Sequence, residues 1–345
     1  MTKHINIPIF IPHLGCPNQC VFCNQRTITG VDELDEKKIY SIIEESLSTI
    51  DDNTSCEIAF FGGSFTGIEY DYMCRLLKVA YAYVGSGRVS SIRCSTRPDY
   101  INEKILDTLW QYGVRVIELG LQSSSDNVLS ATRRGHTSED EKRAARMIVD
   151  YGFTLVGQMM IGLPESSPED EIETARFICG IGAKMARIYP TVVFRETELC
   201  EMAKRGEYVP LSLDEAIERS SNAFKVLYDG GVDVIRIGLC ASENLSSEDT
   251  YYGGPNHPSL GELVLNEVYY SIIKEKISHH QNKNHGAFYI YVKNGCLSRA
   301  IGQKKKNKMR LEALYPDMKF VFREDFKLDA FDVKIEYEER IKKCI

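Results

Sequence analysis

The chain has 345 residues, of which 43% are hydrophobic and 26% are charged, and its formal net charge is −7 at pH 7. This is the composition of an ordinary globular protein, with a length that suits one large domain plus a smaller one, or two medium domains. No run approaches the roughly 20 apolar residues of a membrane span, and the first residues do not resemble a signal peptide. Eleven cysteines, an odd number and mostly scattered, exclude a secreted disulfide scaffold and predict a cytoplasmic protein.

Three of the cysteines lie close together, directly after the apolar run 5–11. Cys16, Cys20 and Cys23 have the spacing C-x3-C-x2-C, and thiolates prefer zinc or iron–sulfur clusters to hard cations. Three thiolates leave one iron of a four-iron cluster open to another ligand, which indicates a reactive site. Zinc would need a fourth ligand, and the spacing of His13 suits it poorly. The spacing therefore favours an iron–sulfur cluster, with a zinc loop or reduced thiols as the alternatives.

Segments of strand character alternate with amphipathic segments up to about residue 240. The expected strands are 5–11, 56–61, 91–96, 114–121, 153–161, 185–193 and 232–237. The expected helices are 33–49, 70–84, 103–112, 139–150, 168–179 and 213–228. Apolar strands that are each followed by a helix form a parallel sheet with right-handed crossovers. The pattern predicts an α/β fold, a partial or complete (β/α) barrel with its chemistry at the carboxyl ends of the strands.

Polar motifs follow the second and third expected strands. Gly62 and Gly63 permit close approach of a ligand to the backbone, although such a pair is also a common turn. Arg97 precedes a proline at the end of the third strand. Its guanidinium could bind a carboxylate bidentately, or it could pair with Asp99 or Glu103.

Further polar residues accompany the fourth strand. Glu118 lies within an apolar run, so its carboxylate needs a partner, either an arginine or a ligand. Gln122 offers both a donor and an acceptor, which suits a ribose or a carboxylate. Arg133 and Arg134 open the next helical segment and either bind a carboxylate or are solvated loop charges.

Taken together, these motifs resemble one known superfamily. The cysteine motif, with an aromatic residue before its last cysteine, resembles the signature of radical S-adenosylmethionine (SAM) enzymes. The later motifs resemble, in order and spacing, the radical SAM domain of the elongator catalytic subunit family and, more distantly, oxygen-independent coproporphyrinogen oxidase. The likeness covers about residues 5–240 and is carried by Gly62-Gly63-Ser64-Phe65-Thr66, Ser95-Thr96-Arg97-Pro98-Asp99, Glu118-Leu119-Gly120-Leu121-Gln122-Ser123, Arg134-Gly135-His136-Thr137 and Tyr189-Pro190-Thr191.

The resemblance implies two cofactors and a set of residues that bind them. Cys16, Cys20 and Cys23 would hold a [4Fe–4S] cluster whose open iron binds SAM. An electron from a donor such as ferredoxin or flavodoxin would cleave SAM to a deoxyadenosyl radical, which abstracts hydrogen from the substrate. The implied SAM contacts are Gly62, Gly63, Ser64, Arg97, Glu118, Gln122, Arg134 and Gln158.

Two departures from the elongator family limit the comparison. Gln158 stands where the relatives often have an aspartate, which could change how the SAM ribose is held. The chain also has no segment long enough for the acetyltransferase domain of the elongator subunit. The elongator reaction itself, carboxymethylation of a wobble uridine with acetyl-CoA, is therefore not carried over.

The remaining third of the chain predicts a second module. Residues 241–260 are polar and read as a linker or a loop over the barrel mouth. In 261–345 the expected order is helix 262–277, strand 288–292, helix 297–301, helix 307–314 and strand 319–323. This order resembles a KH domain, an RNA-binding module whose G-x-x-G loop clamps phosphates. Here the loop is Gly302-Gln303-Lys304-Lys305, so the second glycine is missing.

A run of cations accompanies this loop, and no acidic residue interrupts it between residues 297 and 310. Such a patch is typical of a surface that binds a phosphate backbone, although many charge runs are only solvated helix faces. The run starts at Arg299, and the predicted RNA-binding residues are Gly302, Lys304, Lys305, Lys306, Lys308 and Arg310.

The sequence thus predicts a radical SAM enzyme, with a barrel at 1–240, a linker or lid at 241–260 and a small α+β, KH-like domain at 261–345. The favoured substrate is an RNA of the transfer RNA class. One alternative is a small-molecule substrate, as in the coproporphyrinogen oxidase relatives, and another is a non-catalytic iron–sulfur protein that binds RNA. No residue identifies itself as an acid or base for the substrate.

Overall fold

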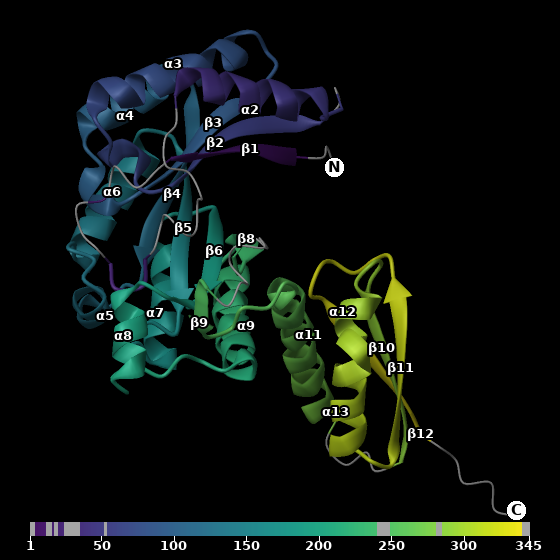
Figure 1. Cartoon of the computed structure of the whole chain (residues 1–345). Coiled ribbons are helices and arrows are strands. Elements are labelled where there is room, and N and C mark those ends of the chain that lie inside the picture. Colours follow the sequence, from purple (N-terminus) through teal and green to yellow (C-terminus); the bar gives the residue numbers. More distant parts are fainter. Residues whose placement is uncertain are drawn as a thin grey trace, which may run out of the picture. The chain divides into compact units, whose positions relative to one another are not determined.

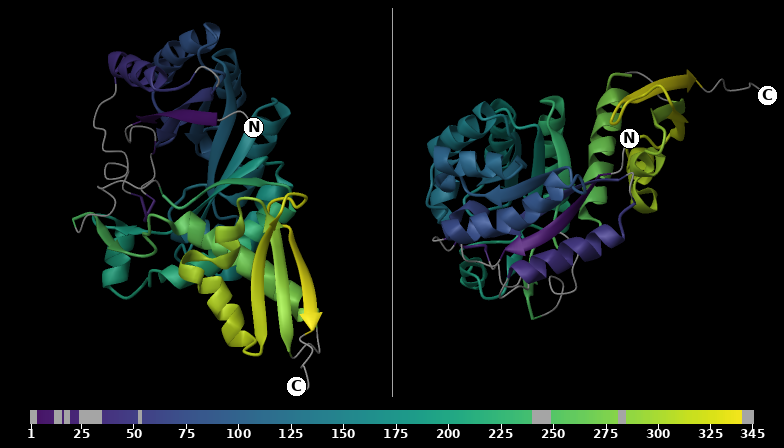
Figure 2. Two further views of the ribbon diagram at one scale, coloured as in Figure 1. Left: turned by 90° about the vertical axis from the view of Figure 1, so that its right-hand side faces the viewer. Right: turned by 90° about the horizontal axis from the view of Figure 1, so that it is seen from above.

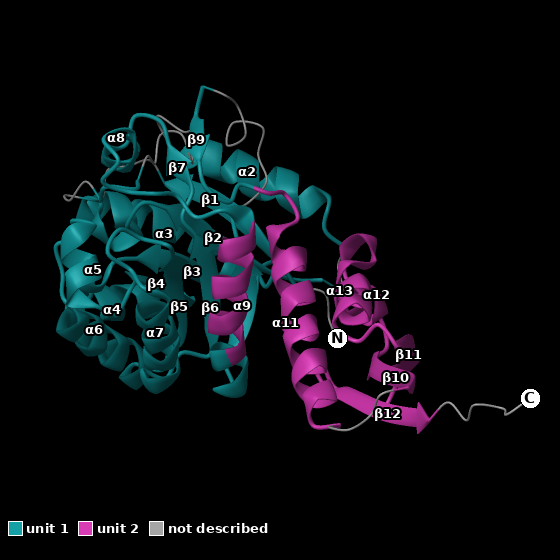
Figure 3. Cartoon of the chain, turned by 90° about the horizontal axis from the view of Figure 1, so that it is seen from below, with its two compact units in different colours: residues 1–213, 226–256 teal, residues 214–225, 257–345 magenta. Residues whose placement is uncertain are grey.

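The computed structural model describes residues 4–11, 16, 20–23, 35–51, 54–239, 249–280 and 285–339. The chain divides into two compact units (Figures 1 and 3). Unit 1 comprises Met1–Leu213 and Val226–Asn256, and unit 2 comprises Asp214–Lys225 and His257–Ile345. Within the described part of the chain, no helix has the length and apolar character needed to cross a bilayer.

Unit 1 is built on a seven-stranded sheet in which every neighbouring pair is parallel. In spatial order the strands are β1 (His4–Ile11), β2 (Ser55–Gly62), β3 (Ser91–Thr96), β4 (Val114–Gln122), β5 (Thr154–Ile161), β6 (Met185–Pro190) and β8 (Asp233–Ile237). Among the described residues, β1 and β8 lie at the two edges and do not pair with each other. The sheet is therefore a partial barrel, which confirms the predicted (β/α) architecture.

Helices connect the strands and cover the sheet, as the view from above shows (Figure 2). They are α2 (Glu36–Ser48), α3 (Tyr70–Gly85), α4 (Glu103–Gln111), α5 (Asp126–Ala131), α6 (Ser138–Asp150), α7 (Pro168–Gly180), α8 (Glu198–Lys204) and α9 (Leu213–Asp229), which contributes residues to both units. Thr137 and Ser167 begin α6 and α7 with capping boxes, which satisfy backbone donors at each helix start. Covered strands explain the long apolar runs, such as residues 116–121 of β4, all of which are buried.

The structure differs from the expected elements around residue 190. The single strand expected at 185–193 is divided into β6, which ends at Pro190, and β7 (Val193–Phe194). Proline has no backbone N–H to continue a ladder. Strand β7 pairs instead in antiparallel fashion with β9 (Tyr251–Gly253), a strand within the segment expected to be linker or loop. Residues 241–248 of that segment lie outside the described part of the chain.

Unit 2 contains a three-stranded sheet with helices on its buried face. The elements are α11 (Leu260–Ser278), β10 (Gly286–Lys293), α12 (Leu297–Ile301), α13 (Lys306–Leu314), β11 (Met318–Asp325) and β12 (Val333–Glu339), with a short 3₁₀ turn at Gln303–Lys305. Strand β10 is central, parallel to β11 and antiparallel to β12. Alternate residues Phe288, Ile290 and Val292 of β10 face a core that includes Tyr269 and Leu311.

The expected strand–helix–loop–helix–strand order is present, whereas β12 was not expected. In β12, Val333, Ile335 and Tyr337 alternate with charged residues. This alternation is typical of an edge strand with one solvated face, but the charges obscure it in the sequence. The likeness of unit 2 to a KH domain stays a prediction.

Candidate functional site

Two arginines that follow neighbouring strands meet one cysteine of the C-x3-C-x2-C motif. Arg97 follows β3, and Arg134 follows α5, the short helix after β4. Arg97 Nη1 lies 3.8 Å from Cys20 Sγ, and Arg134 Nη1 lies 3.3 Å from the same atom. All three residues are buried. The backbone N–H of Cys23 donates to the carbonyl of Cys20 at 3.0 Å, which closes a tight turn between two of the cysteines.

The glycine pair after β2 leads to a contact with another cysteine. Gly62 has a φ of 107°, a conformation that favours glycine. Ser64 follows the pair, and the thiol of Cys16 donates to its Oγ at 3.5 Å. Among the described residues, no three His, Cys, Asp or Glu side chains are grouped so that they could hold one metal ion. Joint coordination by the three cysteines therefore stays a prediction, and His13 lies outside the described residues.

Gln122 ends β4 with a strained backbone and a buried acceptor. Its φ is 75°, in the left-handed region that non-glycine residues seldom adopt. Its Oε1 is buried and has no hydrogen-bond partner among the residues described. A Cβ added to Gly120 would lie 3.1 Å from Gln122 Nε2, so the bare glycine leaves room for the side chain of Gln122. Backbone strain and an unsatisfied buried atom together indicate a ligand position.

Glu118 is fully buried and takes the first of its two predicted partners, arginine. Its Oε1 accepts from Arg93 Nη1 at 3.1 Å and from Arg187 Nη2 at 2.8 Å. Its Oε2 accepts from Gln158 Nε2 at 2.8 Å. Side chains from β3, β5 and β6 thus bind both carboxylate oxygens, which compensates the burial of the charge.

These contacts extend into a row of polar side chains across five adjacent strands. Arg93 also binds Glu57, with Nε 2.8 Å from Oε2. The row runs through Glu57 on β2, Arg93 on β3, Glu118 on β4, Gln158 on β5 and Arg187 on β6. Arg93 and Arg187 were not predicted as site residues. Both could have been identified in the sequence by the feature that singled out Glu118, namely a charged residue within an apolar strand.

A buried histidine–glutamate pair and the more exposed Asp99 lie near Arg97. Asp99 forms the ion pair that the sequence offered as one alternative, with Arg97 Nε 2.9 Å from Oδ1 and Nη2 3.0 Å from Oδ2. His136 Nδ1 lies 3.8 Å from Asp99 Oδ1, and His136 Nε2 lies 3.0 Å from Glu141 Oε1. Burial, aided by Arg134 and Arg97, lowers the pKa of His136 to about 3. Burial raises the pKa of Glu141 to about 9. At neutral pH the pair is therefore an imidazole and a carboxylic acid, and the acid donates the hydrogen bond.

The basic run of unit 2 is less positive in space than in the sequence. Arg299 pairs with Glu262, Lys306 with Asp214 at 3.1 Å, Lys308 with Glu312 at 3.8 Å, and Arg310 with Glu267. Four of the six cations are thus paired, because acids from other parts of unit 2 and from farther along α13 reach them.

Lys304 and Lys305 are the exceptions. Both are exposed, and within the described part of the chain neither forms an ion pair with an acid. They lie after Gly302 and have φ values of 51° and 63°, so two consecutive lysines have a left-handed backbone conformation. Such strain is characteristic of functional sites.

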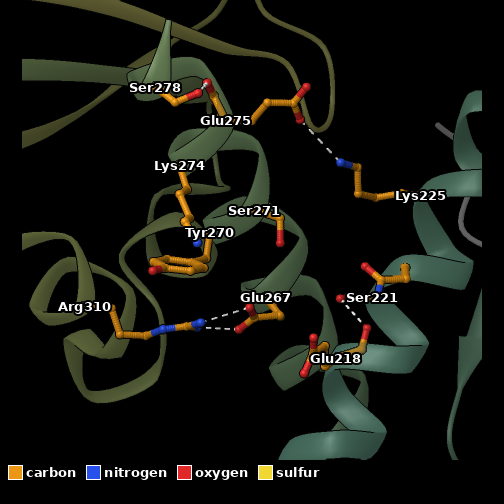
Figure 4. Close-up of a pocket in the computed structure, with 11 residues that line it drawn as sticks. Glu218, Ser221, Lys225, Glu267, Tyr270, Ser271, Lys274, Glu275, Ser278 and Arg310 are labelled. Atoms are coloured by element: carbon orange, nitrogen blue, oxygen red, sulfur yellow. Dashed lines mark hydrogen bonds and ion pairs between the residues drawn. The ribbon is translucent and has the colours of Figure 1, made fainter. Parts of the chain in front are cut away.

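Arg310 lies beside a polar groove of unit 2 (Figure 4). Its guanidinium bonds both oxygens of Glu267, at 2.5 and 3.1 Å, and lies 3.5 Å from the centroid of the Tyr270 ring. Lys225 and Glu275 form a further ion pair at 3.5 Å in the same groove. Arg310 is therefore held by its own unit, which makes it a weaker candidate for RNA than the sequence implied.

Comparison with known families identifies the superfamily of the chain. Residues 10–178 match the model of the radical SAM superfamily, and residues 183–270 match the model of the radical SAM C-terminal domain. The chain belongs to the radical SAM superfamily. The prediction of an enzyme that uses a [4Fe–4S] cluster and SAM, the cofactors of this superfamily, is thereby confirmed.

Curated relatives of this radical SAM chain include proteins of the elongator type. The tRNA uridine(34) acetyltransferase of Methanocaldococcus jannaschii is 31% identical over 191 residues, which cover 50% of this chain and 35% of the relative. Elongator complex protein 3 of Saccharomyces cerevisiae is 31% identical over 143 residues, 41% of this chain and 26% of that protein. The match spans only 35–52% of the length of the first such relatives. The predicted resemblance to the elongator family is confirmed.

A solved structure shows the same relation. The archaeal Methanocaldococcus infernus Elp3 with an N-terminal deletion superposes with a TM-score of 0.62 and 25% identity. The superposition covers 80% of this chain and 64% of that one.

The residues present fit the cofactors of the superfamily. Thiols are the ligands that iron–sulfur clusters prefer. Cys16 contacts Ser64, and Cys20 contacts Arg97 and Arg134. The unsatisfied Oε1 of Gln122 is an acceptor that an amine or a ribose hydroxyl of SAM would satisfy.

Proposed function

We propose that this radical SAM enzyme modifies an RNA of the transfer RNA class. The observation that carries the proposal is the 31% identity over 191 residues with a protein named as a tRNA uridine(34) acetyltransferase. Lys304 and Lys305, which are exposed and have a strained backbone beside Gly302, support it. Lysines that are not paired with acids are able to neutralise the phosphates of an RNA backbone.

Cys16, Cys20 and Cys23 are the proposed ligands of the cluster. When bound, the cluster and SAM supply an electron and a carbon-centred radical that removes a hydrogen atom from the substrate. The electron donor is proposed to be a ferredoxin or a flavodoxin.

The strand ends are proposed to position SAM. The backbone at Gly62, Gly63 and Ser64 would hold its amino group, and Gln122 Oε1 would accept a hydrogen bond from it. Arg134 lies within reach of both Gly120 and Cys20, where it could also meet a carboxylate.

Glu118 and Gln158 have a different place in the proposal. Because Glu118 is fully buried and binds Arg93, Arg187 and Gln158, it would influence SAM only by orienting Gln158. Glu118 is thus a positioning residue, and Gln158 is the one that would meet the ribose.

A small-molecule substrate is the second candidate. It is favoured by the pairing of Arg299, Lys306, Lys308 and Arg310 with acids, which leaves unit 2 with little net positive charge at these positions. In that case unit 2 would serve as a lid or an assembly element.

Mass spectrometry of nucleosides from the total RNA of a strain lacking this gene distinguishes the two candidates. The RNA proposal predicts that one modified nucleoside disappears and returns when the gene is restored. A complete set of modified nucleosides in the deletion strain would contradict it and leave the small-molecule candidate.

A further inference from the structure

Two buried guanidinium groups converge on a single thiol. Arg97 is 3% exposed and Arg134 is 5% exposed, and both direct an Nη1 at Cys20 Sγ. Burying a charge is costly unless an opposite charge or strong hydrogen bonds compensate it. Asp99 compensates the charge of Arg97, yet one Nη1 of each arginine still faces the thiol of Cys20, where it can donate to a thiolate.

Both arginines are fixed by other parts of unit 1. Arg97 is bound by both oxygens of Asp99 and donates through Nη2 to the carbonyl of Arg134. Arg134 donates through Nη2 to the carbonyl of Gly120 at 2.6 Å. The geometry around Cys20 is thus set by the protein alone, as expected of groups that tune a bound metal.

We propose that the guanidinium groups of Arg97 and Arg134 donate to the sulfur of Cys20 when it binds the cluster, and that they raise the reduction potential of the cluster. The inference rests on the proposed function, in which Cys20 binds a [4Fe–4S] cluster. A four-iron cluster held by three thiolates is an anion, and it becomes more negative when it accepts an electron. Positive charge and hydrogen bonds at a ligand sulfur therefore stabilise the reduced cluster more than the oxidised one.

An anaerobic redox titration of the full-length, reconstituted protein tests this, with the reduced cluster followed by electron paramagnetic resonance in the absence of SAM. Arg97→Gln and Arg134→Gln each remove one cation. At the solution potential that half-reduces the wild-type cluster, the ratio of reduced to oxidised cluster is expected to fall on the order of tenfold in each variant, because each variant loses one charged hydrogen-bond donor to the ligand sulfur.

Arg115→Gln is the matched control, because Arg115 is an exposed arginine near the opposite end of β4. It should leave the ratio unchanged. Arg97→Lys and Arg134→Lys keep a cation with a shorter reach and no fork. Their ratios should lie between those of the wild type and the Gln variants. If the arginines had only a structural role, the ratio would not depend on whether the substituted side chain is charged. If a Gln variant binds no iron, the Lys variant at that position decides.

Wild-type ratios in Arg97 and Arg134 variants with full iron content would overturn the inference and leave the proposed function intact. A wild-type protein that binds no cluster under these conditions would instead contradict the proposed function.

Discussion

At the scale of single residues, unit 1 holds charges inside its sheet by pairing them with one another. Glu118 is the centre of this arrangement, since two arginines and Gln158 bind its carboxylate. The sequence predicted that Glu118 needs a partner, and it offered an ion pair with Asp99 or Glu103 as one of two alternatives for Arg97. It could not predict Arg93 and Arg187 as partners, because the registers of β3, β4 and β6 decide which side chains meet.

Removal of the Glu118 carboxylate should strongly destabilise unit 1. Glu118→Ala leaves Arg93 and Arg187 buried without this acceptor, and the breaking of a buried pair costs about 3–5 kcal/mol. Urea unfolding followed by the fluorescence of Trp110, the single tryptophan, measures the loss. Glu139→Ala removes an exposed carboxylate from α6 and should change the free energy of unfolding by less than about 1 kcal/mol. Equal losses in the two variants would disprove the importance of the buried row.

The neutral His136–Glu141 pair should give unit 1 a characteristic dependence on pH. From pH 6.5 to 9 the folded state keeps a proton on Glu141 that the unfolded state has released, so stability falls as pH rises. From pH 4.5 down to 3 the unfolded state carries a proton on His136 that the folded state does not bind, so stability falls as the pH falls. Between pH 4.5 and 6.5 the two effects oppose each other.

Glu141→Gln tests the alkaline branch. The variant lacks the titrating acid, so its free energy of unfolding should decrease less between pH 6.5 and 9 than that of the wild type, by up to about 1.4 kcal/mol per pH unit. Glu139→Gln, at an exposed position on the same helix, should keep the wild-type slope. Identical slopes for Glu141→Gln and the wild type would mean that Glu141 is ionised in the folded protein.

At the scale of elements, periodicity predicted every strand of the parallel sheet, because covered strands are continuous apolar runs. It missed β9, which has three residues, and β12, whose apolar residues alternate with charges.

Charge runs were harder to interpret. The partners of Arg299 and Arg310 lie on α11, some forty residues earlier, so the sequence alone shows an unrelieved patch where the fold supplies acids.

The loop at 303–305 makes a separate prediction about RNA. Because Lys304 and Lys305 already have left-handed backbones, Lys304→Gly and Lys305→Gly together should remove two cations and keep the loop conformation. Fluorescence anisotropy with labelled transfer RNA should show weaker binding. The slope of the logarithm of the binding constant against the logarithm of salt concentration should become shallower by about 0.7 for each lost phosphate contact. Lys319→Gln, at an exposed lysine on β11, should change neither. Unaltered binding by the double variant would move the RNA site elsewhere.

At the scale of the whole molecule, the chain combines a radical SAM barrel with a smaller unit and matches only part of the length of its elongator-type relatives. The cysteine spacing and the order of the strand-end motifs were sufficient to predict the superfamily. They were insufficient to predict which side chains touch, since the Cys20–Arg134 contact joins residues 114 positions apart.

The central claim, radical SAM chemistry at the C-x3-C-x2-C motif, is tested most directly by the formation of deoxyadenosine from SAM. Anaerobically reconstituted protein should produce it under dithionite. Cys20→Ala should not, while Cys74→Ala, which changes a thiol on α3 outside the motif, should retain the activity. Absence of deoxyadenosine from wild-type protein with a fully loaded cluster would contradict the account.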